Sequence, residues 1–239
     1  MEEKMSGIVL GGVNFGENDR ILNVFTLEQG VVSAKIKGVK KAGAKLKFAS
    51  EPFCFAEFIF MKKGNMRTVI GASLLDSFYP VREDIFRYFC AGSVVEFIKK
   101  FYREDIVSEQ TFMFAVNALK EIAYGDNPKS KLIEFLLHAL KPAGYALYLN
   151  ACAACDGDIS GEVFFDYRRG AFFCKECFDG VGREILSVTY QALRLADEGG
   201  LTDGVEGVHK ALFLIDYYLQ KRTDERINSL AELVKMCVQ

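Results

Sequence analysis

The spacing of hydrophobic positions changes near residue 80. Before it, short apolar runs alternate with polar positions and are separated by glycine-containing turns, a pattern typical of β-strands. The alternation breaks around Gln29-Gly30, which predicts a hairpin, and the sequence KKGN at 62–65 predicts another turn. Several strands in so short a segment favour a small closed or partly closed β-barrel over residues 1–79. A small β-sandwich is the alternative.

Beyond Pro80 the pattern is helical. Only Pro128 and Pro142 interrupt this part of the chain, and apolar residues from 85 to 101 recur at the spacing of one helix face. Ser108 is a candidate N-cap for the next helix. We therefore expect an α+β, multidomain chain, in which an all-α domain over residues 80–239 follows the barrel and carries an insertion over 150–180. The predicted helical segments are 85–102, 111–124, a third that begins at 129 and stops near Pro142 and Gly144, and then 181–199, 205–222 and 224–237.

The insertion contains four of the seven cysteines, arranged as two C-x2-C pairs with eighteen residues between them. The pairs are Cys152 with Cys155 and Cys174 with Cys177. This spacing is typical of a zinc site, because two thiolates on each of two tight turns can surround a tetrahedral ion. The residues between the pairs read as a hairpin with Gly170 at its turn. Four thiolate ligands leave no position for water, so the predicted zinc is structural.

Other uses of these cysteines are disulfides, a redox motif and an iron–sulfur cluster. The segment MEEKMSGIVLGGV at the start of the chain lacks the apolar core of a secretory signal, and cytosolic thiols stay reduced, so disulfides are not expected. Two C-x2-C copies at this spacing favour a metal over a redox pair, and an iron–sulfur cluster stays open as an alternative. Cys54, Cys90 and Cys237 lie in apolar runs and are expected in the core.

Charge is unevenly distributed along the chain. The net charge of −2 and the pI near 5.9 argue against a nucleic-acid partner when taken as a whole. Residues 1–80, however, carry 11 Lys and Arg against 8 Asp and Glu, a net charge of +3, and residues 81–239 carry −5. Residues 31–50 contain no acid and six lysines, which are Lys35, Lys37, Lys40, Lys41, Lys45 and Lys47. Binding of phosphates explains such a loop, and a solvated loop kept for solubility is the alternative.

Motifs of catalysis and membrane insertion are missing from the sequence. No apolar run reaches the ~18 residues of a membrane helix, and neither a G-x-S-x-G motif nor a Walker loop occurs. The two histidines, His138 and His209, have no obvious ligand or base partner in the sequence. The sequence therefore does not predict an active site.

The order of the motifs along the chain also indicates a relationship to other proteins. Residues 7–41 run through an apolar strand, an aromatic-Gly-Glu-x-Asp turn, an apolar strand ending in Phe-Thr, a glycine, and a strand that enters the basic loop. The cysteine pairs follow in the helical region, and YYLQKRTDERINSLAEL closes it. In this order the chain resembles the bacterial recombination mediator family RecO over nearly its full length. Two departures are a basic loop built only from lysine, where the family often uses arginine, and Arg168-Arg169-Gly170-Ala171, where a Gly-Gly pair is common.

This resemblance implies a fold and a function. The barrel is expected to be an OB-fold and the insertion to bind one structural zinc ion per chain. The implied function is binding of single- and double-stranded DNA, annealing of complementary strands and, with the partner RecR, displacement of single-stranded-DNA-binding protein and loading of RecA during recombinational repair. The implied protein is not an enzyme, has no membrane partner and is cytoplasmic and nucleoid-associated.

The candidate DNA-binding residues lie on the barrel. An OB-fold binds strands with a basic groove and with aromatic rings on which bases stack. The six lysines supply the charge, Arg20 can add to it, and Phe15 and Phe48 are candidate stacking rings, with plain core packing as their alternative. A second aromatic group is assigned to the core and consists of Phe53, Phe55, Phe58 and Phe60.

Two other functions stay open at this stage. An RNA-binding, translation-associated module also combines an OB-fold with a zinc ribbon. An enzyme with a structural zinc, for example a nuclease, would use acids such as Glu17 and Asp19. Two acids are few for this chemistry, and turn formation or a local charge pair explains them more simply. The net charge of the helical part favours protein partners there.

Overall fold

The computed structural model describes residues 1–103 and 107–237. Its first five strands close into a barrel in the order β1-β2-β3-β5-β4, with β3 and β5 parallel and the other pairs antiparallel. This is an OB-type barrel, so the barrel prediction is confirmed and the sandwich alternative is wrong. The strands are β1 (Glu2–Phe15), β2 (Asp19–Thr26), β3 (Gly30–Ile36), β4 (Phe55–Lys63) and β5 (Met66–Asp76).

Both predicted turns are present in the barrel. In the β2–β3 hairpin, Thr26 pairs with Gly30, and the Thr26 hydroxyl donates to the Gly30 carbonyl at 2.8 Å while accepting from the Gln29 amide. The β4–β5 hairpin turns at Gly64, whose φ of 60° is a conformation that glycine adopts without strain. These turns fix the register of the strands, so that apolar residues alternate into the barrel.

The interior of the barrel is apolar and contains stacked aromatic rings. Phe58 and Phe60 are fully buried and stack with ring centroids 5.6 Å apart, and they pack among aliphatic side chains of β1, β2 and β3. Phe53 is also buried, whereas Phe55 is partly buried. The assignment of this aromatic run to the core is confirmed for the three buried rings.

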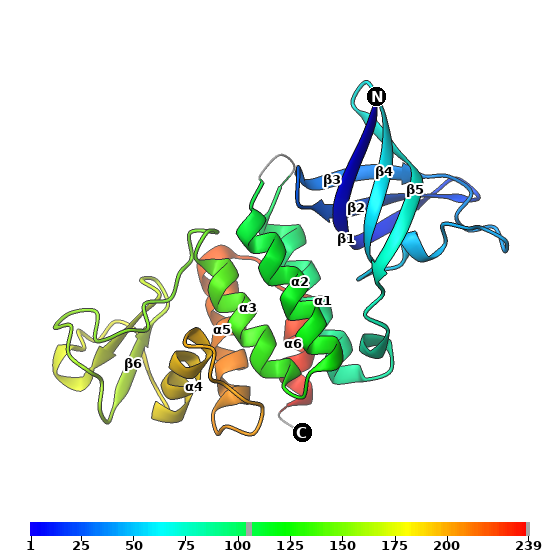
Figure 1. The fold of residues 1–239 in the computed structure, drawn as a ribbon. Coiled ribbons are helices and arrows are strands. Elements are labelled where there is room, and N and C mark those ends of the chain that lie inside the picture. Colours follow the sequence, from blue (N-terminus) through cyan, green and yellow to red (C-terminus); the bar gives the residue numbers. More distant parts are fainter. Residues whose placement is uncertain (104–106, 238–239) are drawn as a thin grey trace.

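In the part of the chain that the structure describes, six helices follow the barrel (Figure 1). The side chains of Asp84 and Ser108 cap the first two helices by accepting from the amides of Arg87 and Thr111, so the predicted cap at Ser108 is confirmed. Such caps contribute about 1 kcal/mol each. The helices are α1 (Ile85–Phe101), α2 (Glu109–Tyr124), α3 (Pro128–Leu140), α4 (Ser187–Asp197), α5 (Val208–Thr223) and α6 (Asn228–Met236). Short 3-10 turns are η1 (Phe48–Ser50), η2 (Tyr79–Arg82) and η3 (Lys175–Cys177).

The insertion between α3 and α4 is a small antiparallel sheet in the order β7-β6-β8. Its strands are β6 (Val163–Asp166), β7 (Ala171–Cys174) and β8 (Arg183–Ile185). The prediction of helix from residue 181 onward is therefore wrong at its start. Residues 183–185 pair with β6, where Val163 lies opposite Ile185, and the helix begins only at Ser187. A pairing between distant segments overrides a local helical pattern here.

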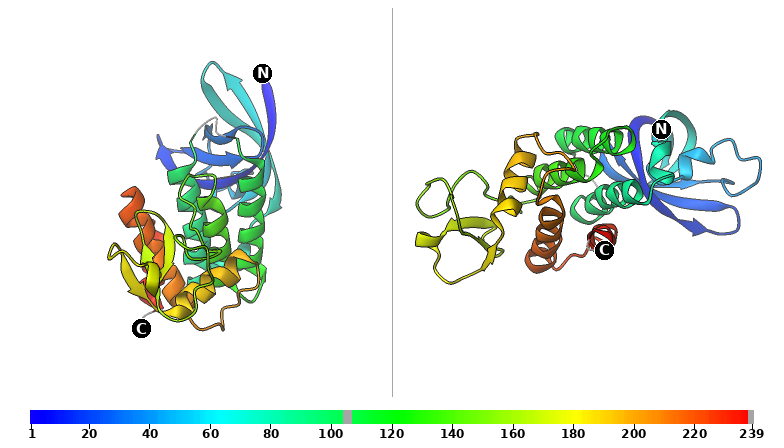
Figure 2. Two further views of the ribbon diagram at one scale, coloured as in Figure 1. Left: turned by 90° about the vertical axis from the view of Figure 1, so that its left-hand side faces the viewer. Right: turned by 90° about the horizontal axis from the view of Figure 1, so that it is seen from below.

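The barrel and the insertion lie at opposite ends of an elongated molecule, with the helices between them (Figures 1 and 2). The barrel packs against the helices through a shared core, in which the Phe25 ring lies 5.9 Å from Tyr102 and 5.5 Å from Phe112. The predicted division into domains at residues 79 and 80 stays a prediction. Within the described residues, no helix has both the length and the apolar character that a membrane span requires.

Candidate metal centre and nucleic-acid interface

The cysteine quartet (Cys152, Cys155, Cys174 and Cys177) is assembled by a turn and a hairpin. The first pair lies on a turn in which the Asp156 amide donates to the Cys152 carbonyl at 2.9 Å. The second pair begins with Cys174, the last residue of β7, and ends with Cys177 in η3, and the pairing of β7 with β6 confirms the predicted hairpin. The Ala153 amide donates to the carbonyl of Phe172 on β7, and this bond holds the two pairs together.

Tight packing at the hairpin turn requires a glycine. Gly170 has a φ of 63°, and a Cβ there would lie 2.9 Å from the Tyr218 hydroxyl and 3.0 Å from the Ala146 carbonyl. The Gly170 carbonyl also accepts from the Tyr148 amide at 2.8 Å. The predicted turn residue is thus confirmed, and it lies against the helical domain.

The geometry of the quartet fits a tetrahedral metal ion. The four Sγ atoms lie within 4.8 Å of one another. Among the described residues, they are the cluster of Cys, His, Asp or Glu side chains that could hold a metal ion. Four thiolates at about 2.3 Å from a zinc ion stand about 3.8 Å apart, so little movement would bring them into contact with one ion. The four donors are all sulfur, which zinc and iron–sulfur clusters accept and calcium or magnesium do not.

Charge at the quartet also favours a bound cation. Burial raises the pKa of Cys152, but backbone amides of Cys174, Ala154 and Cys155 outweigh burial and lower this pKa to about 6. Hydrogen bonds of its thiol to Cys174 and Cys155 raise the pKa of Cys177 to about 12. The low pKa of one thiol and the high pKa of its neighbour show that ionisation of one sulfur opposes that of the next, and a bound cation would favour the thiolate form of both.

The strand β7, which ends at Cys174 of the cysteine quartet, packs against the core of the helical domain. Phe172 of β7 packs against Tyr190 of α4 with ring centroids 5.0 Å apart, and the Tyr190 hydroxyl donates to the Leu149 carbonyl. Of the other three cysteines, Cys54 and Cys90 are buried as predicted, and Cys237 is half-buried.

The candidate nucleic-acid interface is the other site, at the barrel end. Five of its predicted lysines are exposed on the lysine loop (residues 37–47), which extends away from the helices (Figures 1 and 2). Val39 is buried in the barrel core and Leu46 packs against that core, so the loop is anchored at both ends. These five lysines are Lys37, Lys40, Lys41, Lys45 and Lys47.

Asp19 joins the lysine loop to the β1–β2 turn. Its carboxylate accepts from the Gly38 amide at 2.8 Å and pairs with the Lys35 ammonium at 2.8 Å. The hydrogen bond from Lys35, followed by that from Gly38, lowers the pKa of Asp19. The Lys35 Nζ in turn lies 4.4 Å from the centroid of the Phe15 ring, which is 46% exposed. Phe15, Lys35 and the lysine loop are thus neighbours in space.

Two other predicted residues lie in different surroundings. The Arg20 guanidinium donates to the carbonyls of Ser50 at 2.8 Å and Gly12 at 3.2 Å, and holds the segment before β4 against β1. Phe48 is partly buried against the barrel core. The structure therefore brings Phe15, and not Phe48, to the surface beside the lysines.

The β4–β5 hairpin forms a second side of this interface that the sequence did not predict. A cavity of about 220 Å³ opens between the β1–β2 turn, β3 and the β4–β5 hairpin. Its lining includes Phe15 and Lys35 together with Asn65, Met66 and Arg67. The sequence KKGN at 62–65 predicts the turn between β4 and β5. Only the parallel pairing of β3 with β5 brings that turn beside Phe15.

Comparison with known proteins agrees with this architecture. The family model "Recombination protein O N terminal" matches residues 1–78, and "Recombination protein O C terminal" matches residues 82–231. A DNA repair protein RecO of Anaeromyxobacter sp. (strain K) is 32% identical over 203 residues, which cover 83% of this chain and 80% of that protein. Those of Bacillus subtilis and Acetivibrio thermocellus are 29% and 27% identical, over 75% and 74% of this chain and 70% of each relative.

Two family models thus cover most of the chain, one over the barrel and one over the helical region with the cysteine quartet. The curated relatives carry the same family name over most of their own length. The chain belongs to the RecO family of DNA repair and recombination proteins.

Proposed function

We propose that this chain binds DNA through its barrel, anneals complementary single strands and, with RecR, helps to load RecA onto DNA coated with single-stranded-DNA-binding protein. The observation that supports this most strongly is the anchored lysine loop beside the exposed ring of Phe15, in a chain of the RecO family. The loop keeps five cations on one surface without carboxylate partners among the described residues. Such a surface attracts a polyanion by releasing its condensed counterions.

Each part of the interface has a distinct task in this proposal. The exposed lysines contact phosphates at any sequence, since a lysine acts as a point charge and lacks the planar fork of arginine. Phe15 stacks on a base, and the cavity beside it receives that base against Met66 and Arg67. Lys35 and Asp19 keep the Phe15 ring and the loop together. Arg20 contributes mainly by fixing the strands, with a weaker direct share in DNA binding.

The quartet is proposed to bind one structural zinc ion. Its four sulfur donors and their spacing support zinc, with an iron–sulfur cluster as the alternative. An ion with four thiolate ligands has no open position for water, so it stabilises the insertion and does not take part in chemistry.

A mediator without catalytic activity fits the acids of the barrel better than a nuclease does. Asp19 is engaged by Lys35 and by the Gly38 amide, and the metal-binding group found among the described residues does not include Glu17 or Asp19. Binding of both single- and double-stranded DNA in the cytoplasm, at the nucleoid, completes the proposal.

Competition between DNA and RNA tests this function against an RNA-binding module. We expect a labelled DNA oligonucleotide bound to the chain to resist displacement by RNA of the same sequence, and to remain intact in the presence of magnesium. Fluorescence anisotropy with gel analysis of the recovered strand measures both. A marked preference for RNA would favour the translation-associated alternative, and cleavage of the strand would favour a nuclease.

A further inference from the structure

A second surface with exposed cations and aromatic rings lies at the insertion end of the molecule. Two cavities of about 240 and 460 Å³ adjoin there, because Arg183 of β8 and Tyr217 of α5 line both. The smaller cavity continues along α5 past Phe213 to Lys210, and the larger continues to Tyr167 and Arg168 at the hairpin turn. We name this continuous surface the distal groove.

The wall formed by α5 presents two aromatic rings flanked by two lysines. Lys210, Phe213, Tyr217 and Lys221 recur at helical spacing, so they form one stripe that extends roughly 16 Å along the helix. Phe213 is 51% exposed although it belongs to a helix whose other large apolar side chains are mostly buried. Phe213 therefore presents an accessible ring between the two lysines of the stripe.

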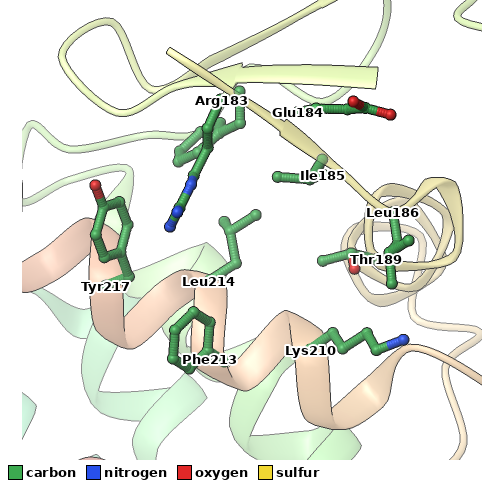
Figure 3. A pocket seen from close by; sticks show the side chains of 10 residues that line it. Arg183, Glu184, Ile185, Leu186, Thr189, Lys210, Phe213, Leu214 and Tyr217 are labelled. Atoms are coloured by element: carbon green, nitrogen blue, oxygen red, sulfur yellow. The ribbon is translucent and has the colours of Figure 1, made fainter. Parts of the chain in front are cut away.

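The opposite wall places a cation against one of these rings. The Arg183 guanidinium of β8 lies 5.2 Å from the centroid of Tyr217. On α5 itself, the Lys221 Nζ lies 6.0 Å from the same centroid. The Arg168 guanidinium lies 5.9 Å from the centroid of Tyr167. Figure 3 shows Arg183 directed from β8 toward Tyr217, with Phe213 and Lys210 farther along α5.

The distal groove also lacks compensating acids. Elsewhere in this end of the molecule cations are paired, as Arg169 is with Asp166 and Asp179. Three cations line the groove (Arg168, Arg183 and Lys210), and neither they nor Lys221 beside Tyr217 form an ion pair with any described residue. Glu184 is the one acid lining the groove among the described residues, and its carboxylate points away from Arg183 (Figure 3). The groove is therefore locally positive in a region whose net charge is −5.

The geometry points to the distal groove as a second binding site for single-stranded nucleic acid, separate from the barrel. A strand presents a phosphate at each nucleotide and a flat base between phosphates. This matches the cations spread along the groove, with the exposed ring of Phe213 and the half-buried rings of Tyr217 and Tyr167 among them. An acidic peptide with one apolar anchor would instead need cations gathered at one end. With the barrel at the opposite end, one chain can hold two strands.

A second strand-binding site rests on the proposed function and extends it. Measuring how many oligonucleotides one chain binds distinguishes the site on the barrel from the site in the distal groove. The probe is a thymidine oligonucleotide of about 12 nucleotides, within the length that one such site covers, titrated into the full chain at low salt. We expect two oligonucleotides per chain. The variant R183E/K210E is expected to bind one, and a variant with the five loop lysines changed to alanine is also expected to bind one. K120E, which makes the same kind of charge change at an exposed position outside both sites, is the control and is expected to bind two.

Each outcome has a defined meaning. If the parent chain binds one oligonucleotide and R183E/K210E still binds it, or if R183E/K210E still binds two, the distal groove is not a nucleic-acid site. If the parent chain binds one and R183E/K210E binds none, the groove stands and the barrel assignment fails. If the lysine variant still binds two while R183E/K210E binds one, the barrel assignment fails and the groove stands. Phe213→Ala tests stacking with little change in charge, and is expected to weaken the second binding event at least about fivefold. Tight binding of an acidic peptide at the groove, without competition from the oligonucleotide, would overturn the proposal in favour of a protein partner.

Discussion

Replacing Cys174 with alanine is expected to release the metal and to destabilise the chain. Metal binding and local folding are coupled in sites of this kind, because the ligands are brought together only by the folded turns. The insertion shares the core of the helical domain through Phe172 and Tyr190, so we expect the loss to reach beyond the two turns. The metal content should fall from one zinc ion per chain to near zero. The thermal midpoint should fall by at least about 5 °C, which corresponds to about 2 kcal/mol for a chain of this size.

A second cysteine provides the control for this experiment. Cys237→Ala changes a half-buried thiol outside the quartet and is expected to keep the metal. Elemental analysis of protein purified without chelator measures zinc and iron together, and differential scanning calorimetry measures the midpoint. Iron in place of zinc would favour a cluster. A parent chain without metal, or a C174A variant that keeps it, would contradict the metal centre.

Removing the charge of the lysine loop is expected to weaken DNA binding for every sequence. If the five exposed lysines each neutralise one phosphate, their replacement by alanine reduces the slope of log affinity against log salt by up to about 3.5 for single strands. At about 0.1 M salt this corresponds to a loss of affinity at the barrel of roughly 100-fold or more. Anisotropy with single-stranded oligonucleotides at several salt concentrations measures both quantities.

A matched pair of triple variants separates the loop from a general effect of charge. K40A/K41A/K45A removes three loop lysines, and K99A/K120A/K235A removes three exposed lysines outside the loop and the cysteine quartet. We expect the first variant to flatten the salt slope and the second to leave it near that of the parent. Equal slopes for the two variants would show that the loop makes no specific contribution.

The local pattern of the sequence was sufficient for the parts of the fold that depend on neighbouring residues. Alternation and glycine-containing turns predicted the barrel strands, and cap residues such as Ser108 predicted helix starts. The cysteine quartet was also predictable, since the spacing of C-x2-C pairs directly reflects the geometry of two turns around one ion.

Features that depend on closure of the chain in three dimensions were not predictable in this way. Residues 183–185 form a strand because β6 lies beside them, although their sequence continues a helical pattern. The charge of Arg20 predicts a DNA-binding role like that of the lysines, but its guanidinium donates two hydrogen bonds to backbone carbonyls. Arg67 and Met66 reach the candidate interface only because β5 pairs with β3 at barrel closure.

The distal groove illustrates the same limit. Its walls come from β8 and α5, which are separated by an intervening helix in the chain. Each wall by itself contains ordinary surface residues, such as Lys210 and Arg183. Their significance follows from the distance of 5.2 Å between Arg183 and the Tyr217 ring, which no sequence pattern gives.

Annealing of complementary strands that have been coated with single-stranded-DNA-binding protein tests the central claim most directly. The assay follows the formation of duplex from two labelled strands, in the absence of ATP, with the parent chain and the five-lysine variant. We predict rapid annealing by the parent chain without nucleotide and a marked loss of rate for the lysine variant. Failure of the parent chain to anneal coated strands, or equal annealing by the lysine variant, would contradict the proposal that the barrel of this RecO family member mediates annealing of coated DNA.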